Sequence, residues 1–180
     1  MIRSSRIAAW VASIALLAGC ASPYGPHGAT GGYKDTKIDD STYLVRFDGN
    51  GNTPREKVWN YWIYRCAELT VTNGYQYFAQ MATEQPKTLW DEDTGWHMQN
   101  TKGYVAPTYI YVPGSTVYTY HASAVIHMFK PPLPTDVSYA IDAPVVMEML
   151  KDYVTSGGTK PAPKREEVLQ RAGVRFGKPS

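Results

Sequence analysis

One helix, expected from Thr53 to Asn73, constrains the fold of this chain more than any other segment. It opens on Thr53–Glu56, which has the form of a capping box with proline in the first turn, and it ends before Gly74, which suits a left-handed C-cap. Apolar residues fall on one helical face at Val58, Trp62, Cys66 and Leu69. That face is widened by Trp59, Ile63 and Thr70. Such a helix is expected to pack on a sheet and to be covered on a second side by the tail or a partner.

Alternating polarity on both sides of this helix predicts strands. Before it, Tyr33–Ile38 and Tyr43–Asp48 flank turn-forming residues and predict a hairpin. After it, strands are expected at Tyr75–Met81, Tyr104–Val112 and Thr116–Phe129. The last two form a predicted hairpin with Pro113-Gly114 in a type II turn. In the final strand, the face interpreted as core consists of Tyr118, Tyr120, Ala122, Ala124, Ile126 and Met128.

A second helix is expected to begin at Asp142, its N-cap. Along one of its sides lie Val145, Met149 and Tyr153. A Gly/Pro linker over Thr155–Pro163 follows, and Lys164–Ala172 has the length of two helical turns. The order ββαβββα predicts an α+β two-layer domain over residues 33–155, with a largely antiparallel sheet of about five strands and two helices on one face. Residues 156–180 are then a linker and C-terminal tail.

The start of the chain has the form of a bacterial lipoprotein leader. Two arginines precede an apolar run over residues 7–17, which suits a signal peptide and is shorter than the roughly 20 residues of a membrane-spanning helix. Leu17–Cys20 then forms a lipobox, with cleavage expected between Gly19 and Cys20. Residues 1–19 would be removed, and Cys20 would carry diacylglycerol and a further chain such as palmitate. The alternatives are an ordinary signal peptide or a short signal anchor with an incidental cysteine.

The residues after the lipobox predict location and attachment. Ala21 stands where an aspartate would signal retention in the inner membrane, so we expect outer-membrane sorting with the domain facing the periplasm. Residues 20–32 are rich in Gly and Pro and are expected to be a lipidated flexible tether, with His27 solvated. Lipidation leaves Cys66 without an intramolecular disulfide partner. We expect Cys66 to be a small buried hydrophobe, the alternative being a reactive or intermolecular thiol.

Charge and motifs exclude several classes of function. The chain holds 18 Lys and Arg against 16 Asp and Glu, and loss of the leader removes two arginines, so the mature chain is nearly neutral and unlike a nucleic-acid-binding protein. No nucleotide fingerprint, G-x-S-x-G or C-x-x-C occurs, so no cofactor is expected. His121 and His127 would stand ~20 Å apart along one strand, too far to share a metal ion. The 14 tyrosines favour contact with other molecules.

A set of short motifs runs through most of residues 20–154. In chain order they are Gly31-Gly32-Tyr33, Leu44-Val45-Arg46-Phe47, Gly49-Asn50-Gly51, Thr53-x-Arg55-Glu56, Tyr64-Arg65-x-Ala67-Glu68-Leu69-Thr70, Asn73-Gly74-Tyr75-x-Tyr77-Phe78, Ala122-Ser123-Ala124 and Tyr139-x-x-Asp142-Ala143. With these motifs the chain resembles a family of proteobacterial outer-envelope lipoproteins that has no assigned activity. The resemblance implies an envelope location and a small α+β domain, and it supplies no catalytic residues.

These observations together favour a non-enzymatic outer-membrane lipoprotein that makes protein–protein or cell-wall contacts in the periplasm. Two alternatives remain, and both use a polar loop expected at residues 83–103. The first is a module that binds peptidoglycan or another glycan. Its contact residues would be Trp90, Trp96 and His97. The second is a hydrolase, in which the working group would be Asp91, Asp93 or His97.

Overall fold

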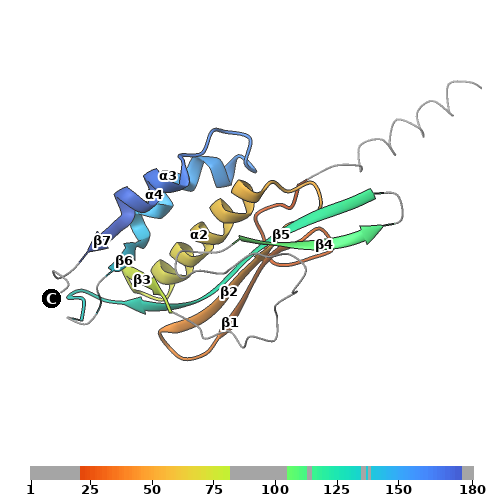
Figure 1. Ribbon diagram of the computed structural model, residues 1–180. Coiled ribbons are helices and arrows are strands. Elements are labelled where there is room, and N and C mark those ends of the chain that lie inside the picture. The colour runs from red at the N-terminus through yellow and green to blue at the C-terminus, as the bar shows by residue number, and fades with distance from the viewer. Residues whose placement is uncertain (1–20, 82–104, 113–114, 135–136, 138, 176–180) are drawn as a thin grey trace, which may run out of the picture.

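The computed structural model describes residues 21–81, 105–112, 115–134, 137 and 139–175. The described residues form three helices and a sheet of seven strands (Figure 1). The elements are β1 (Gly32–Lys37), β2 (Thr42–Asp48), α2 (Arg55–Thr72), β3 (Tyr77–Gln80), β4 (Val105–Val112), β5 (Ser115–Phe129), β6 (Tyr139–Asp142), α3 (Ala143–Thr155), α4 (Arg165–Ala172) and β7 (Gly173–Arg175). The predicted two-layer α+β class is confirmed, and α4 forms where Lys164–Ala172 had the length of two helical turns, whereas the short strands β6 and β7 were not expected.

The long strand β5 organises the sheet, whose order is β1-β2-β5-β3-β6-β7 with β4 also on β5. All pairings are antiparallel, and both predicted hairpins, β1–β2 and β4–β5, are confirmed. Residues 121–127 of β5 pair with β2, while residues 115–122 pair with β4 and residues 126–129 with β3. Because these registers overlap, β4 and β3 must lie end to end along the edge of β5 that β2 leaves open. The predicted Pro113-Gly114 turn lies outside the described residues.

The helix α2 is buried around most of its circumference, as its sequence predicts. The four residues of the expected stripe are buried, and the Trp62 indole satisfies its N–H by donating to the Val45 carbonyl at 3.0 Å. α3 packs against α2, and Arg165 at the start of α4 lies over the Trp59 ring at 5.2 Å. The tail therefore provides part of the second cover. Tyr64 is also buried, because Tyr24 packs edge-on against it at 5.3 Å.

Two details of the helices differ from expectation. Thr53 does not cap α2: the N-cap is Pro54, and no side chain of a described residue caps that end. The Asp142 cap of α3 is confirmed, since the backbone N–H of Val145 donates to Asp142 Oδ1 at 3.2 Å. The buried side of α3 is rotated from the predicted one, because β6 ends directly at the helix and fixes its orientation. Its buried residues are Ala143, Val146, Leu150, Tyr153 and Val154.

The prediction of a flexible tether is wrong for residues 22–32. Ser22 is fully buried, and its backbone N–H donates to Thr53 Oγ1 at 2.8 Å. The backbone N–H of Tyr33 donates to the Gly25 carbonyl at 2.8 Å, which closes the segment onto β1. Gly31, at φ +98°, approaches β2 so closely that a Cβ would stand 2.2 Å from the Asp48 carbonyl oxygen. The glycines that suggested flexibility therefore allow close packing.

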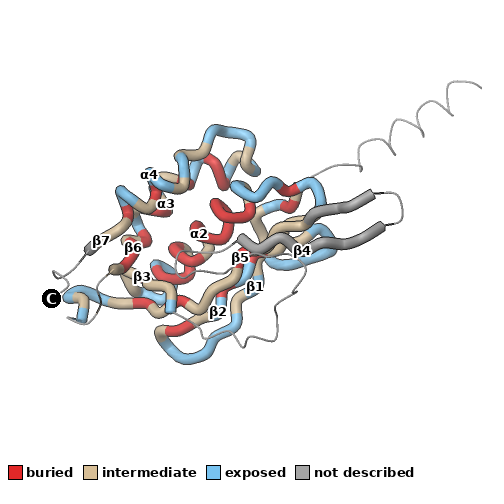
Figure 2. The backbone as a smooth tube through the Cα atoms, in the orientation of Figure 1, coloured by how far each residue is buried: buried red, intermediate tan, exposed pale blue. Residues whose placement is uncertain are grey.

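The core lies between the helices and one face of the sheet (Figure 2). In β2, Val45 and Phe47 are fully buried while Leu44 and Arg46 are exposed. In β5, Ala122, Ile126 and Met128 of the predicted core face are buried, while Tyr120 and Ala124 are partly buried and pack against the core. The strand β3 is shorter than expected, and its buried residue is Phe78.

Candidate functional site

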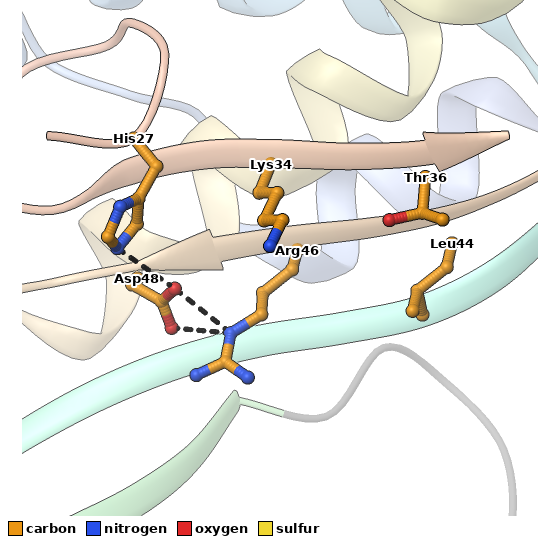
Figure 3. A pocket seen from close by; sticks show the side chains of 6 residues that line it. All are labelled: His27, Lys34, Thr36, Leu44, Arg46 and Asp48. Carbon is orange, nitrogen blue, oxygen red and sulfur yellow. Dashed lines mark hydrogen bonds and ion pairs between the residues drawn. The ribbon is translucent and has the colours of Figure 1, made fainter.

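The face of the sheet opposite the helices bears a hollow at the β1–β2 edge. Because side chains alternate along a strand, the residues between the buried positions of β2 project from this face. The hollow has a volume of about 310 Å³. Its lining residues, shown in Figure 3, are His27, Lys34, Thr36, Leu44, Arg46 and Asp48. His27 comes from the docked N-terminal segment, so that segment adds one wall to a hollow that is otherwise lined by the hairpin.

An ion pair at one end of the hollow fixes the Arg46 side chain. Arg46 Nε donates to Asp48 Oδ1 at 2.7 Å and to Oδ2 at 2.9 Å. His27 Nε2 lies 3.5 Å from Asp48 Oδ2 on the other side. The Arg46 side chain is 50% exposed, against 20% for Asp48. Figure 3 shows the two terminal nitrogens of Arg46 turned away from Asp48, so only Nε of the guanidinium is bonded to this carboxylate.

Lys34 gives the hollow an excess of positive charge. Lys34 and Arg46 are directly paired in the β1–β2 register, and Figure 3 shows the Lys34 ammonium group pointing towards Arg46. Two like charges at opposed positions of a hairpin destabilise it. Asp48 compensates one of them. An arginine fork beside a lysine is an arrangement that binds a carboxylate or another oxyanion, and Leu44, 36% exposed, adds an apolar contact beside it.

The strand β5 places two histidines on the same face of the sheet. His121 is paired with Asp48 and His127 with Thr42, so the two rings stand six residues apart along β5. Burial lowers the pKa of His121, Arg46 lowers it further, and Asp48 opposes this shift. The His127 ring nitrogen Nδ1 is hydrogen-bonded to Thr42 Oγ1 at 2.8 Å. Among the described residues, no group of three His, Cys, Asp or Glu side chains is placed to hold a metal ion.

Cys20 and the loop residues proposed from the sequence for ligand contact or catalysis lie outside the described residues. The loop residues are Trp90, Asp91, Asp93, Trp96 and His97. Cys66 is buried, as predicted, and its burial raises the pKa of its thiol. Lys34, Leu44 and Arg46 were missed as site residues. The only sequence signal for them was the alternation of the strands, which places these residues on the face opposite the core.

The described residues that flank the 82–104 segment are bonded to β5. At its start, the backbone N–H of Met81 donates to the Val125 carbonyl at 2.9 Å. At its end, Val105 pairs with Ala122. Both points lie on the edge of β5 that also carries β3 and β4. The described residues on either side of the segment that contains Trp90, Trp96 and His97 therefore lie beside the middle of β5.

Comparisons with known proteins give no family assignment. No protein-family model, curated protein or solved structure matches this chain. Among the helices of the described residues, none combines the length and apolar character that crossing a membrane requires.

Proposed function

We propose that this chain is a non-enzymatic lipoprotein, anchored in the outer membrane through Cys20, whose domain binds an acidic protein partner in the periplasm. The anchor and location rest on the lipobox and on the family resemblance of the sequence. The interaction surface rests on the hollow in the face of the sheet opposite the helices. Among the described residues no helix covers this face, and the hollow is lined by the side chains of His27, Lys34, Thr36, Leu44, Arg46 and Asp48.

The observation that carries this proposal is the juxtaposition of Lys34 and Arg46. The pair weakens the hairpin in the absence of a ligand, since like charges in opposed positions repel each other. A carboxylate from a partner would offset that repulsion and would accept hydrogen bonds from both cations. Leu44 beside them provides apolar area that a small free anion would leave exposed. A protein partner satisfies both features, because its acidic side chain can bind the two cations while the surface around that side chain covers Leu44.

A role in binding suits the chemistry of the hollow better than a role in catalysis. Arg46 and Asp48 are paired with each other at the surface, and the His27 side chain is 48% exposed. A general acid or base is normally tuned by burial or by a dedicated partner. A half-exposed charged group such as Arg46 acts instead as a reversible charge contact, whose strength depends on ionic strength.

Membrane attachment is tested by replacing the acceptor of the lipid. The wild-type chain is expected to remain with the membrane fraction after a high-salt wash, whereas the Cys20→Ala variant is released. Retention of Cys20→Ala in the washed membranes would contradict the anchor.

The binding surface is tested by site-directed crosslinking in cells. A photoreactive amino acid replaces Thr36, which is exposed and lines the hollow. We expect one crosslinked partner whose attached peptide contains Asp or Glu. Double charge reversal, Lys34→Glu with Arg46→Glu, should abolish the adduct, and reversal of the partner's acidic residue to Lys should restore it.

A matched control also replaces one lysine and one arginine by glutamate, but on the helices, on the opposite side of the sheet from the hollow. Lys151 on α3 and Arg171 on α4 are both exposed. The Lys151→Glu/Arg171→Glu variant is expected to keep the adduct. Equal crosslinking by the two double variants would overturn the proposed surface and leave the lipid anchor unaffected.

A further inference from the structure

The position of Ser22 determines which end of the domain faces the membrane. Ser22 is fully buried and hydrogen-bonded to Thr53 and Asn50. Cys20 is only two residues before it, a distance of at most about 7–8 Å along the chain. If Cys20 carries the lipid, as proposed above, the bilayer surface must lie close to the turn that contains Asn50 and Thr53. The domain is then mounted directly on the membrane instead of hanging from a tether.

A two-stranded ribbon projects from this same end of the domain. The strand β2 runs towards the anchor and stops pairing at Asp48, which is opposed to His121. The next contact is the hydrogen bond from the Gly49 N–H to the Tyr120 carbonyl at 2.8 Å. Because β5 is antiparallel to β2, its residues 115–119 continue beyond this point, paired with residues 108–112 of β4. Figure 1 shows the β4–β5 hairpin projecting from the end of the domain opposite to β7.

The sequence of the ribbon, defined as residues 108–112 and 115–119, is unlike that of a solvated hairpin. It reads Thr-Tyr-Ile-Tyr-Val and Ser-Thr-Val-Tyr-Thr, with three tyrosines and no charged residue. Within the described part of the chain, β4 pairs with β5 alone. A two-stranded hairpin by itself is at best marginally stable in water. Edge strands exposed to water usually carry charges that prevent aggregation, so the absence of charge points to a ribbon that is covered.

We propose that this ribbon contacts the lipid bilayer and is a second membrane attachment of the anchored domain. Its length beyond Tyr120, ~15 Å at about 3.3 Å per residue, is enough to enter the interfacial region. Tyrosine is enriched at that depth because its ring is apolar and its hydroxyl is polar. Two or more acyl chains already hold such a protein stably. The ribbon therefore sets the orientation of the domain, and this role depends on the proposed anchor.

The test uses the lipidated full-length chain in vesicles of phosphatidylethanolamine and phosphatidylglycerol. An environment-sensitive fluorophore is attached to a cysteine at Val117→Cys, or at Val112→Cys as an independent second site. Cys66 does not interfere, because it is buried and its thiol pKa is raised. Thr36→Cys is the control, since Thr36 is exposed on β1 away from the ribbon. We expect a blue shift of the ribbon label and its quenching by nitroxide lipids, with neither effect at Thr36.

The possible outcomes separate this proposal from the anchor. Co-flotation of the chain with the vesicles, combined with ribbon labels no more quenched than Thr36→Cys, would overturn the ribbon contact and leave the anchor standing. Shielding of the ribbon in native membranes but not in the lipid vesicles would assign it to a protein partner and would also overturn the proposal. A wild-type chain that fails to co-float would remove both the anchor and the proposed orientation.

Discussion

The backbone N–H of Ser22 donates to Thr53 Oγ1 at 2.8 Å, across 31 residues of sequence. The bond is enclosed by others: the Asn50 N–H donates to Ser22 Oγ at 2.9 Å, and the Thr53 hydroxyl donates to Asn50 Oδ1 at 2.8 Å. Thr53 therefore does not cap α2. Its hydroxyl instead holds the N-terminal segment against the domain, and this converts an expected tether into part of the fold.

Replacing Thr53 by Val should release this segment. The substitution removes the acceptor for a buried N–H, a loss that typically costs about 1–3 kcal/mol. We expect a corresponding fall in the free energy of unfolding in urea, together with faster amide hydrogen exchange over residues 22–33. Thr53→Ser keeps the hydroxyl and should retain most of the stability. Unchanged exchange over residues 22–33 in Thr53→Val would show that the bond does not hold the segment.

The contrast between Thr53 and Gly74 shows what the sequence could and could not predict. Gly74 adopts φ +77° at the end of α2, as a local C-cap signal predicts. Thr53 stands in an equally clear local signal, but its hydroxyl finds a partner far away in sequence. Local patterns therefore predicted the helix and both hairpins. They did not predict the docking of Ser22, which depends on tertiary contacts.

The candidate site was missed for a similar reason. The alternation of β2 correctly placed Val45 and Phe47 on one face. The excess of positive charge depends on the register that opposes Lys34 to Arg46, and on the docked segment that brings in His27. Neither is visible in a single strand. The strands β6 and β7 are only four and three residues long, too short for periodicity to reveal.

Arg65 is expected to be the most sensitive polar residue of the fold. Its Nη2 lies 2.6 Å from Asp35 Oδ2, it also donates to Glu68, and its guanidinium lies 4.0 Å from the centre of the Tyr33 ring. Burial alone would lower the pKa of Arg65, but the bonds to Asp35 and Glu68 outweigh it and the pKa is raised. Arg65→Leu leaves the partly buried Asp35 without its ion-pair partner and leaves Glu68 with the hydrogen bond from the Tyr24 hydroxyl, and it should cost on the order of 3 kcal/mol, measured by urea denaturation.

A double-mutant cycle separates this pairing from simple packing. The side chains of Arg65 and Asp35 are only 17% and 15% exposed. Asp35→Leu removes the acid that Arg65→Leu would leave unpaired. The loss of unfolding free energy in the Arg65→Leu/Asp35→Leu variant should therefore be smaller than the sum of the losses in the two single variants. If the loss in the double variant equals the sum of the losses in the two single variants, Arg65 and Asp35 are not coupled in the folded state.

The protein should lose stability in mild acid through His121. Burial and the neighbouring Arg46 lower the pKa of this imidazole below its ordinary value of 6.5. The unfolded chain therefore takes up a proton at about pH 6.5, where the folded chain does not, and the free energy of unfolding falls as the pH drops below this value. His121→Gln should show a smaller fall between pH 7 and 5 in thermal denaturation. An identical pH dependence in both proteins would exclude His121 as a source of acid sensitivity.

Ionisation of Tyr61 should lower the stability of the fold at high pH. Its side chain is fully buried between Phe47 and Tyr153, and burial, with a smaller effect of Tyr153, raises its pKa to about 12. The unfolded chain ionises this group near pH 10. The stability that Tyr61 provides is thus complete below pH 10 and is lost as the pH rises towards 12, at about 1.4 kcal/mol per unit.

Tyr61→Phe tests this directly, because the hydroxyl that it removes has no hydrogen-bond partner in the described part of the structure. At pH 7 we expect the variant to be as stable as the wild type or slightly more stable, since loss of an unpaired buried hydroxyl removes its desolvation cost. Between pH 10 and 12, its free energy of unfolding should fall less steeply. Phe47→Leu disturbs the same contact without removing a titratable group, so it should lower stability by a similar amount at every pH. A parallel pH profile for Tyr61→Phe and the wild type would show that Tyr61 is not the group whose ionisation weakens the fold.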